Sequence, residues 1–90
     1  MKYAVKYEDD IITINTQNVD PKGCTSITFE NYGDENITLN KSIKLLKGNS
    51  ITFDNLPNEI IVSQFKIQFD GTGVDPKCLV IRKFDTPLNN

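Results

Sequence analysis

Hydrophobic and polar residues alternate along several short segments of this chain, with the period of two that is typical of half-buried β-strands. The clearest case is residues 64–69, where phenylalanine and isoleucine alternate with glutamine and lysine. Near the N-terminus Tyr3, Val5 and Tyr7 share a second alternating face. This pattern predicts that residues 3–7 form a half-buried strand with those three side chains directed towards the core.

The acidic run at residues 8–10 interrupts this first strand and predicts a turn. Ile12 and Ile14 then alternate with polar residues, so the pattern predicts an N-terminal hairpin over residues 1–16. Further strands are expected at residues 26–29, 37–39, 43–45, 51–53, 64–69 and 78–84. The last of these is apolar on both faces at its centre, which is typical of a strand inside a sheet.

No segment has a helical period, and Ala4 is the only alanine. The sequence therefore predicts an all-β fold, an antiparallel two-sheet sandwich of seven or eight short strands with an immunoglobulin-like or jelly-roll-like outline. A small closed barrel is the alternative. At 90 residues the chain fits one domain, with the sandwich over residues 1–84 and a polar C-terminal arm over residues 85–90.

Composition narrows the function. The chain contains no histidine, which excludes Ser-His-Asp and Cys-His catalytic groups and the usual histidine-based metal sites. We therefore expect a protein that is not an enzyme and has no cofactor. The formal net charge of -2 and the scattered lysines argue against nucleic acid as a partner. Charged residues from Lys2 onwards predict neither a secretion signal nor a membrane span.

An Asp-Pro-Lys turn precedes each of the two cysteines, Cys24 and Cys78. One interpretation is that each turn simply ends a loop and leads into the following strand. The other is that both turns lie at the same end of the sandwich, where the cysteines would meet as a disulfide. Cys24 has the parity of Ser26, which predicts that it faces solvent, and without a secretion signal we expect free thiols.

Two acidic clusters, at residues 8–10 and 34–35, are the candidate metal ligands. Neither has the spaced carboxylates and central glycine of a calcium loop. The sequence therefore predicts solvated turns and no metal site.

Five segments carry a resemblance to a known group of proteins. They are residues 27–33, 36–40, 46–53, and 65–71 with the strand at 79–82. Their rhythm of strands and turns resembles that of the small immunoglobulin-like β-sandwich modules of tailed-bacteriophage virions. The resemblance implies a non-enzymatic accessory protein attached to a larger repeating assembly, as a capsid decoration, head fibre or tail appendage. It also implies a virion location after assembly in the host cytoplasm.

Apolar residues placed in turns and in the C-terminal arm are the candidate partner contacts, because a filled sandwich core leaves them unburied. They are, with their neighbours, Tyr32, Gly33, Asp34, Leu56, Pro57, Pro87 and Leu88. The expected partners are other protein chains of the assembly, with self-association left open. The alternative is a free binding module, either a host-surface adhesion domain or an inhibitor of a host protein.

Overall fold

Eight β-strands make up the regular structure of the computed structural model, which describes residues 2–71 and 73–88. They are β1 (Tyr3–Ile12), β2 (Thr16–Val19), β3 (Ser26–Asn31), β4 (Ile37–Leu39), β5 (Ile43–Leu45), β6 (Ser50–Asp54), β7 (Phe65–Phe69) and β8 (Cys78–Pro87). In that part of the chain no helix is long and apolar enough to cross a membrane.

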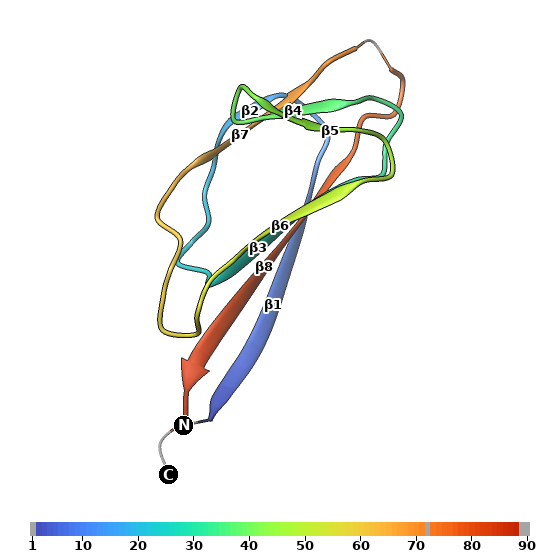
Figure 1. The fold of residues 1–90 in the computed structure, drawn as a ribbon. Helices are drawn as coiled ribbons and strands as arrows, with labels where there is room; N and C mark the ends of the chain where they lie inside the picture. Colours follow the sequence, from blue (N-terminus) through green and yellow to red (C-terminus); the bar gives the residue numbers. More distant parts are fainter. Residues whose placement is uncertain (1, 72, 89–90) are drawn as a thin grey trace.

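The strands form two antiparallel sheets of four, in the orders β1-β8-β3-β6 and β2-β7-β4-β5 (Figure 1). The predicted all-β sandwich is confirmed. A closed barrel is wrong, because each sheet ends in two edge strands.

The strand order is that of a jelly roll. β1 pairs with β8, β2 with β7, β3 with β6 and β4 with β5, so the first half of the chain runs antiparallel to the second as one long ribbon. Wrapping this ribbon gives two four-stranded sheets, which is the eight-stranded jelly-roll arrangement. An immunoglobulin sandwich has a different strand order, with its first, second, fifth and fourth strands in one sheet and its third, sixth and seventh in the other.

The core lies between the sheets, where alternating side chains of both inner faces meet. Its fully buried members include Ile27, Phe29, Ile37, Leu39, Ile67 and Val80. The Phe29 ring centroid lies 5.0 Å from that of Phe65 and 6.2 Å from that of Phe53, so three rings join the two layers. Burial of these large apolar groups supplies most of the stability of such a sandwich.

The predicted N-terminal hairpin is wrong. β1 runs without a turn through the acidic residues and pairs with β8 over ten consecutive positions. The even-numbered residues of β1 face the inner side, because Ile12 pairs with the buried Cys78. Val5 and Tyr7 therefore lie on the outer face, opposite to the prediction. The alternation is that of a half-buried strand, but the other face of the strand is inward.

The predicted C-terminal arm is largely a strand. β8 continues to Pro87, which pairs with Tyr3, and the Asn89 and Asn90 of the predicted arm lie outside the described residues. The β3 ladder reaches only as far as Lys83 on β8. Residues 3–6 and 84–87 thus form a two-stranded ribbon that extends beyond the β3 ladder, at the lower end of Figure 1, with Phe84 at its base packed against the core. We call this the projecting ribbon.

Candidate protein-binding surface

The outer face of the β1–β8 pair carries a group of apolar side chains that we call the outer strip: Val5, Tyr7, Ile11, Leu79 and Ile81. The exposed fractions are 48% for Val5, 65% for Tyr7 and 58% for Ile11. The two β8 members are half-buried, and Leu79 pairs directly with Ile11. Large apolar side chains gathered at such exposure are typical of a contact surface for another protein.

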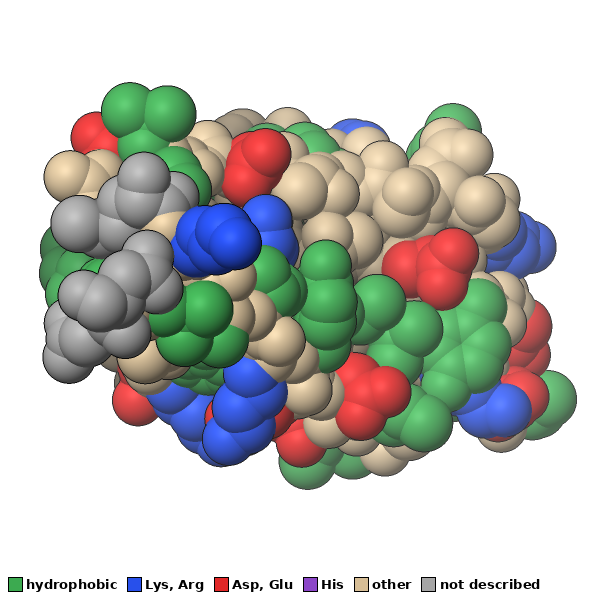
Figure 2. Space-filling view, turned by 90° about the horizontal axis from the view of Figure 1, so that it is seen from below, with side chains coloured by type: hydrophobic (Ala, Val, Ile, Leu, Met, Phe, Trp, Pro, Cys, Tyr) green, Lys and Arg blue, Asp and Glu red, His purple; other side chains and the backbone are tan. Residues whose placement is uncertain are grey.

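Figure 2 shows the molecule from below, and the surface on this side mixes apolar and charged side chains. Hydrophobic side chains there lie between basic and acidic ones, with no wide area of a single charge. Such a surface favours a protein partner over a polyanion, which needs a basic field.

β1 also presents an open edge, since among the described residues β8 is the only strand paired with it. The Leu88 amide donates to the Lys2 carbonyl oxygen over 2.9 Å, which shows that even-numbered positions of β1 direct their backbone groups towards β8. In an antiparallel ladder successive residues direct their backbone N–H and C=O groups to opposite edges of the strand. The odd-numbered residues therefore direct their N–H and C=O groups to the open edge.

A buried arginine anchors this surface to the body of the protein. The side chain of Arg82, on the inner face of β8, is only 4% exposed. Its Nη1 donates to Asp10 Oδ2 of β1 over 2.6 Å, and its Nε donates to the Asp20 carbonyl oxygen over 2.8 Å. The charge-assisted bond to Asp10 holds the C-terminal half of β1 against β8, and the bond to Asp20 ties β8 to the loop after β2.

The seven contact residues predicted from the sequence do not form one surface. They are divided among the turn after β3, the loop after β6 and the end of the projecting ribbon: Tyr32, Gly33 and Asp34; Leu56 and Pro57; Pro87 and Leu88. Because β3 and β6 are antiparallel, the first two groups lie at opposite ends of their sheet. Tyr32 is 43% exposed and has Lys77 Nζ 5.6 Å from its ring centroid. The partner contact of these residues stays a prediction.

The acidic turn at residues 34–35 is not simply solvated, as the sequence had predicted. Glu35 is buried, and its Oε1 accepts a hydrogen bond from the Gly71 amide over 2.6 Å. The Asp34 carboxylate accepts from the amides of Val74 and Asp75. Both side chains therefore fix the β7–β8 loop. Within the described residues no three Cys, Asp or Glu side chains are grouped as metal ligands.

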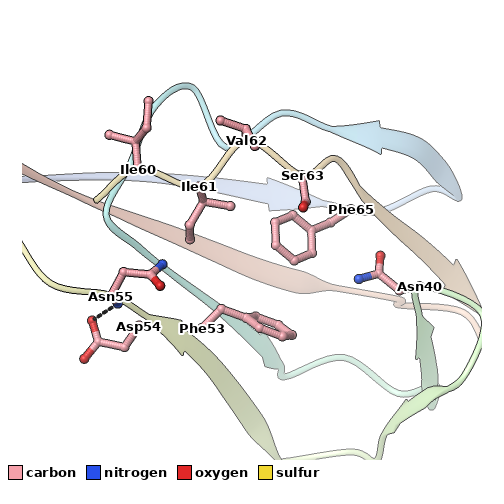
Figure 3. Close-up of a pocket in the computed structure, with 9 residues that line it drawn as sticks. All are labelled: Asn40, Phe53, Asp54, Asn55, Ile60, Ile61, Val62, Ser63 and Phe65. Atoms are coloured by element: carbon pink, nitrogen blue, oxygen red, sulfur yellow. Dashed lines mark hydrogen bonds between the residues drawn. The ribbon is translucent and has the colours of Figure 1, made fainter. Parts of the chain in front are cut away.

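The second candidate surface is a hollow of about 470 Å³ at the open side of the sandwich, between β6 and the β6–β7 connection (Figure 3). Nine residues line it: Asn40, Phe53, Asp54, Asn55, Ile60, Ile61, Val62, Ser63 and Phe65. Ile61 points towards the Phe65 ring, and the amide side chains of Asn40 and Asn55 lie at the margin. Those amides already bond backbone groups, Asn55 to the Thr25 carbonyl oxygen and Asn40 to the Lys66 amide.

The cysteines are free thiols, as predicted, and lie far apart. Cys78 pairs with Asn31 at one end of β3, whereas Cys24 precedes Ser26 at the other, and the strand between spans about 16 Å. A disulfide needs Cα atoms within about 7 Å, so the two Asp-Pro-Lys turns are not neighbours. The predicted solvent exposure of Cys24 is wrong, because it lies in a turn closed by its own amide donating to the Pro21 carbonyl oxygen, before strand alternation begins.

These features define a class: an eight-stranded jelly roll that carries an exposed apolar strip beside an unpaired strand edge. No protein-family model, curated protein or solved structure matches the chain.

Proposed function

We propose that this protein is a non-enzymatic structural protein that attaches to other protein chains through the outer strip. One observation carries the proposal: three large apolar residues of β1 are about half or more exposed on one face of an edge strand. A monomer that stayed alone would leave this area in water, at a cost of about 25 cal/mol for each Å² of apolar surface. Covering it with a neighbouring chain removes that cost.

The fold is compatible with this role. Jelly rolls occur in viral capsid domains and in lectins, and they also host unrelated functions. The virion setting, as a capsid decoration, head fibre or tail appendage, is a narrower form of the proposal. It rests on the resemblance of the strand-and-turn segments alone.

The test compares two double variants that remove similar exposed apolar groups from different places. Val5→Thr with Ile11→Thr reduces the outer strip, and Ile60→Thr with Val62→Thr changes the margin of the hollow. Threonine keeps the strand propensity at Val5 and Ile11 and the branched shape at Ile60 and Val62. Each tagged protein is produced in its native host, and the fraction that sediments with high-mass particles is measured, together with the melting temperature of the purified chain.

The proposal predicts that the outer-strip variant leaves the particle fraction while its melting temperature stays close to wild type. The variant at the hollow should remain with the particles. Full retention of the outer-strip variant, or a wild-type chain found only in low-mass fractions, would overturn the proposal.

A free binding module is the second candidate, favoured by the hollow beside β6. Its walls combine two phenylalanine rings with aliphatic side chains, the usual lining of a small-ligand site. Under this alternative, the Ile60 and Val62 variant would lose binding to a soluble ligand, and the outer-strip variant would keep it. A wild-type chain that is monomeric and bound to no particle is also expected.

A further inference from the structure

β1 is an edge strand that, within the described residues, lacks a proline, a bulge and a covering strand, and its charged side chains are the feature that any further pairing must accommodate. It contains no proline, and its ladder with β8 has no register shift over ten positions. Natural proteins usually protect such an edge with bulges, proline, short strands or a covering loop. The open-edge backbone groups of Tyr3, Val5, Tyr7, Asp9 and Ile11 are therefore available to another strand.

We propose that β1 pairs antiparallel with β1 of a second copy of this chain, in the register that places Tyr7 opposite Tyr7 of the second copy. The two four-stranded sheets then join into one sheet of eight strands with a two-fold axis at Tyr7. The inference rests on the proposed function, because it pairs a second copy with the edge of the strand that carries the outer strip, and the two joined strips then face the other chains of the assembly together.

Charge favours this register over its immediate neighbours. In a two-fold antiparallel pair, residues whose numbers add to a constant lie opposite each other on the same face. With Tyr7 at the centre, Lys6 lies opposite Glu8 of the second copy, and Glu8 lies opposite Lys6. Both side chains are accessible, at 71% and 41% exposed, and now bridge each other within one chain over 3.3 Å.

The neighbouring registers are opposed by like charges. A shift of the centre to Lys6 places two lysines opposite each other, and a shift to Glu8 places two glutamates opposite each other. A centre at Asp9 does the same for two aspartates. Like charges directly across a ladder are destabilising, whereas opposite charges stabilise it.

The projecting ribbon supplies the second argument. Two strands alone are only marginally stable in water. Residues 3–6 and 84–87 extend beyond the β3 ladder as such a pair, whose base is held by Phe84 against the core and by the Thr25 hydroxyl donating to Asp85. In the proposed register, residues 3–6 of one copy lie beside residues 8–11 of the other. Each projecting ribbon thus gains a third strand, which is the part of β1 that belongs to the four-stranded sheet of the other copy. On the outer face, Val5, Tyr7 and Ile11 of both copies form one apolar area.

The experiment measures the mass of the purified chain by light scattering and sedimentation, up to about 1 mM. The wild type should be a dimer. Lys6→Glu places four acidic residues around the axis, and Tyr7→Glu places two glutamates on it. Each should raise the dimer dissociation constant about tenfold or more. Thr52→Glu, on the opposite edge strand β6, is the matched control and should leave the dimer unchanged.

A mixture provides the sharper test. Glu8→Lys alone should also be monomeric, but mixed with Lys6→Glu it should form a heterodimer, because each Lys–Glu pair is restored between chains. Glu8 lies opposite Arg82 on β8, so the melting temperature of Glu8→Lys is measured first. If Glu8→Lys does not fold, Tyr7→Glu tests the interface in its place. Its new carboxylate lies opposite Lys83 of the same chain, so the monomer should remain folded.

A wild-type chain that is monomeric at every concentration would overturn the inference. So would a dimer that survives both Lys6→Glu and Tyr7→Glu, which would place the interface elsewhere. Either result leaves the proposed function standing if the outer-strip variant still loses the particle fraction. Loss of the dimer inference and loss of the proposed function are therefore distinguished by two different measurements.

Discussion

Arg82 Nη1 lies 2.6 Å from Asp10 Oδ2, and only the arginine of this pair is buried. The exposed fraction is 4% for the Arg82 side chain and 54% for that of Asp10. Asp10, which the sequence predicted to lie in a turn, therefore lies in a strand and neutralises the buried charge of Arg82. Because Asp10 belongs to β1 and Arg82 to β8, the ion pair also fixes the edge strand.

Removal of Asp10 should destabilise the fold, since it leaves the buried guanidinium with only the Asp20 carbonyl oxygen among its hydrogen-bond acceptors in the described residues. We expect Asp10→Ala to lower the free energy of unfolding by about 1–3 kcal/mol, measured by urea denaturation. Asp9→Ala, one residue away on the outer face, is the control and should change it by about 0.5 kcal/mol or less. Equal effects of the two substitutions would show that the Arg82 pair contributes nothing.

Gly33 lies so close to the β7–β8 loop that an added Cβ would overlap the Lys77 amide nitrogen and the Asp75 carbonyl oxygen. Backbone atoms cannot move aside cheaply, so Gly33→Ala should cost about 1–3 kcal/mol of stability. At Gly71 an added Cβ would meet only the Glu35 carboxylate, 3.3 Å away on a side chain. Gly71→Ala should therefore cost clearly less in thermal unfolding. A larger loss at Gly71 than at Gly33 would contradict this packing.

Burial raises the pKa of the Cys78 thiol from 9.0 to about 12. Above about pH 9 the unfolded chain loses this proton while the folded chain keeps it, so the unfolded state binds fewer protons. The Cys78 contribution to stability is thus complete below about pH 9 and is lost as the pH rises towards 12. The slope reaches about 1.4 kcal/mol per pH unit.

The measurement follows the free energy of unfolding of wild type and Cys78→Ala at several pH values between about 8 and 11. The stability advantage of wild type over Cys78→Ala should shrink with rising pH. Val80→Ala, two residues along the same buried face and without a titrating group, should keep a constant difference from wild type. A pH-independent difference for Cys78→Ala would mean that its thiol ionises as readily in the folded state as in the unfolded state.

The sequence predicted the sandwich because alternation is a local property, and strands such as β7 show it plainly. It could not show which face of β1 is inner. Val5 and Tyr7 share one face in any strand, but the inner side is set by pairing with β8, more than 70 residues away in the chain. Three consecutive acidic residues at positions 8–10 locally predict a solvent-exposed turn. They lie within a strand because Arg82, distant in the sequence, pairs with Asp10.

The candidate surface was missed for the same reason. An apolar residue in a loop, such as Tyr32 or Leu56, is a local signal of a contact surface, whereas an apolar residue in an alternating strand is a local signal of the core. The one local signal was Lys6 and Glu8, two opposite charges on the other face of the same strand. Their pattern becomes informative only when the strand is known to be an edge.

Hydrogen exchange should show the alternating direction of the β1 backbone. In a monomeric sample of Tyr7→Glu, the amides of Lys6, Glu8 and Asp10 point towards β8 and should exchange slowly. The amides of Val5 and Asp9 point to the open edge and should exchange at rates close to those of an unfolded chain. In concentrated wild type the open-edge amides should become protected, because the second copy would accept their hydrogen bonds. Residue-resolved NMR exchange at two concentrations gives the comparison. Uniform protection along β1 in the monomeric sample would show that its edge is already covered within one chain, and uniform fast exchange would show that β1 does not stay paired with β8.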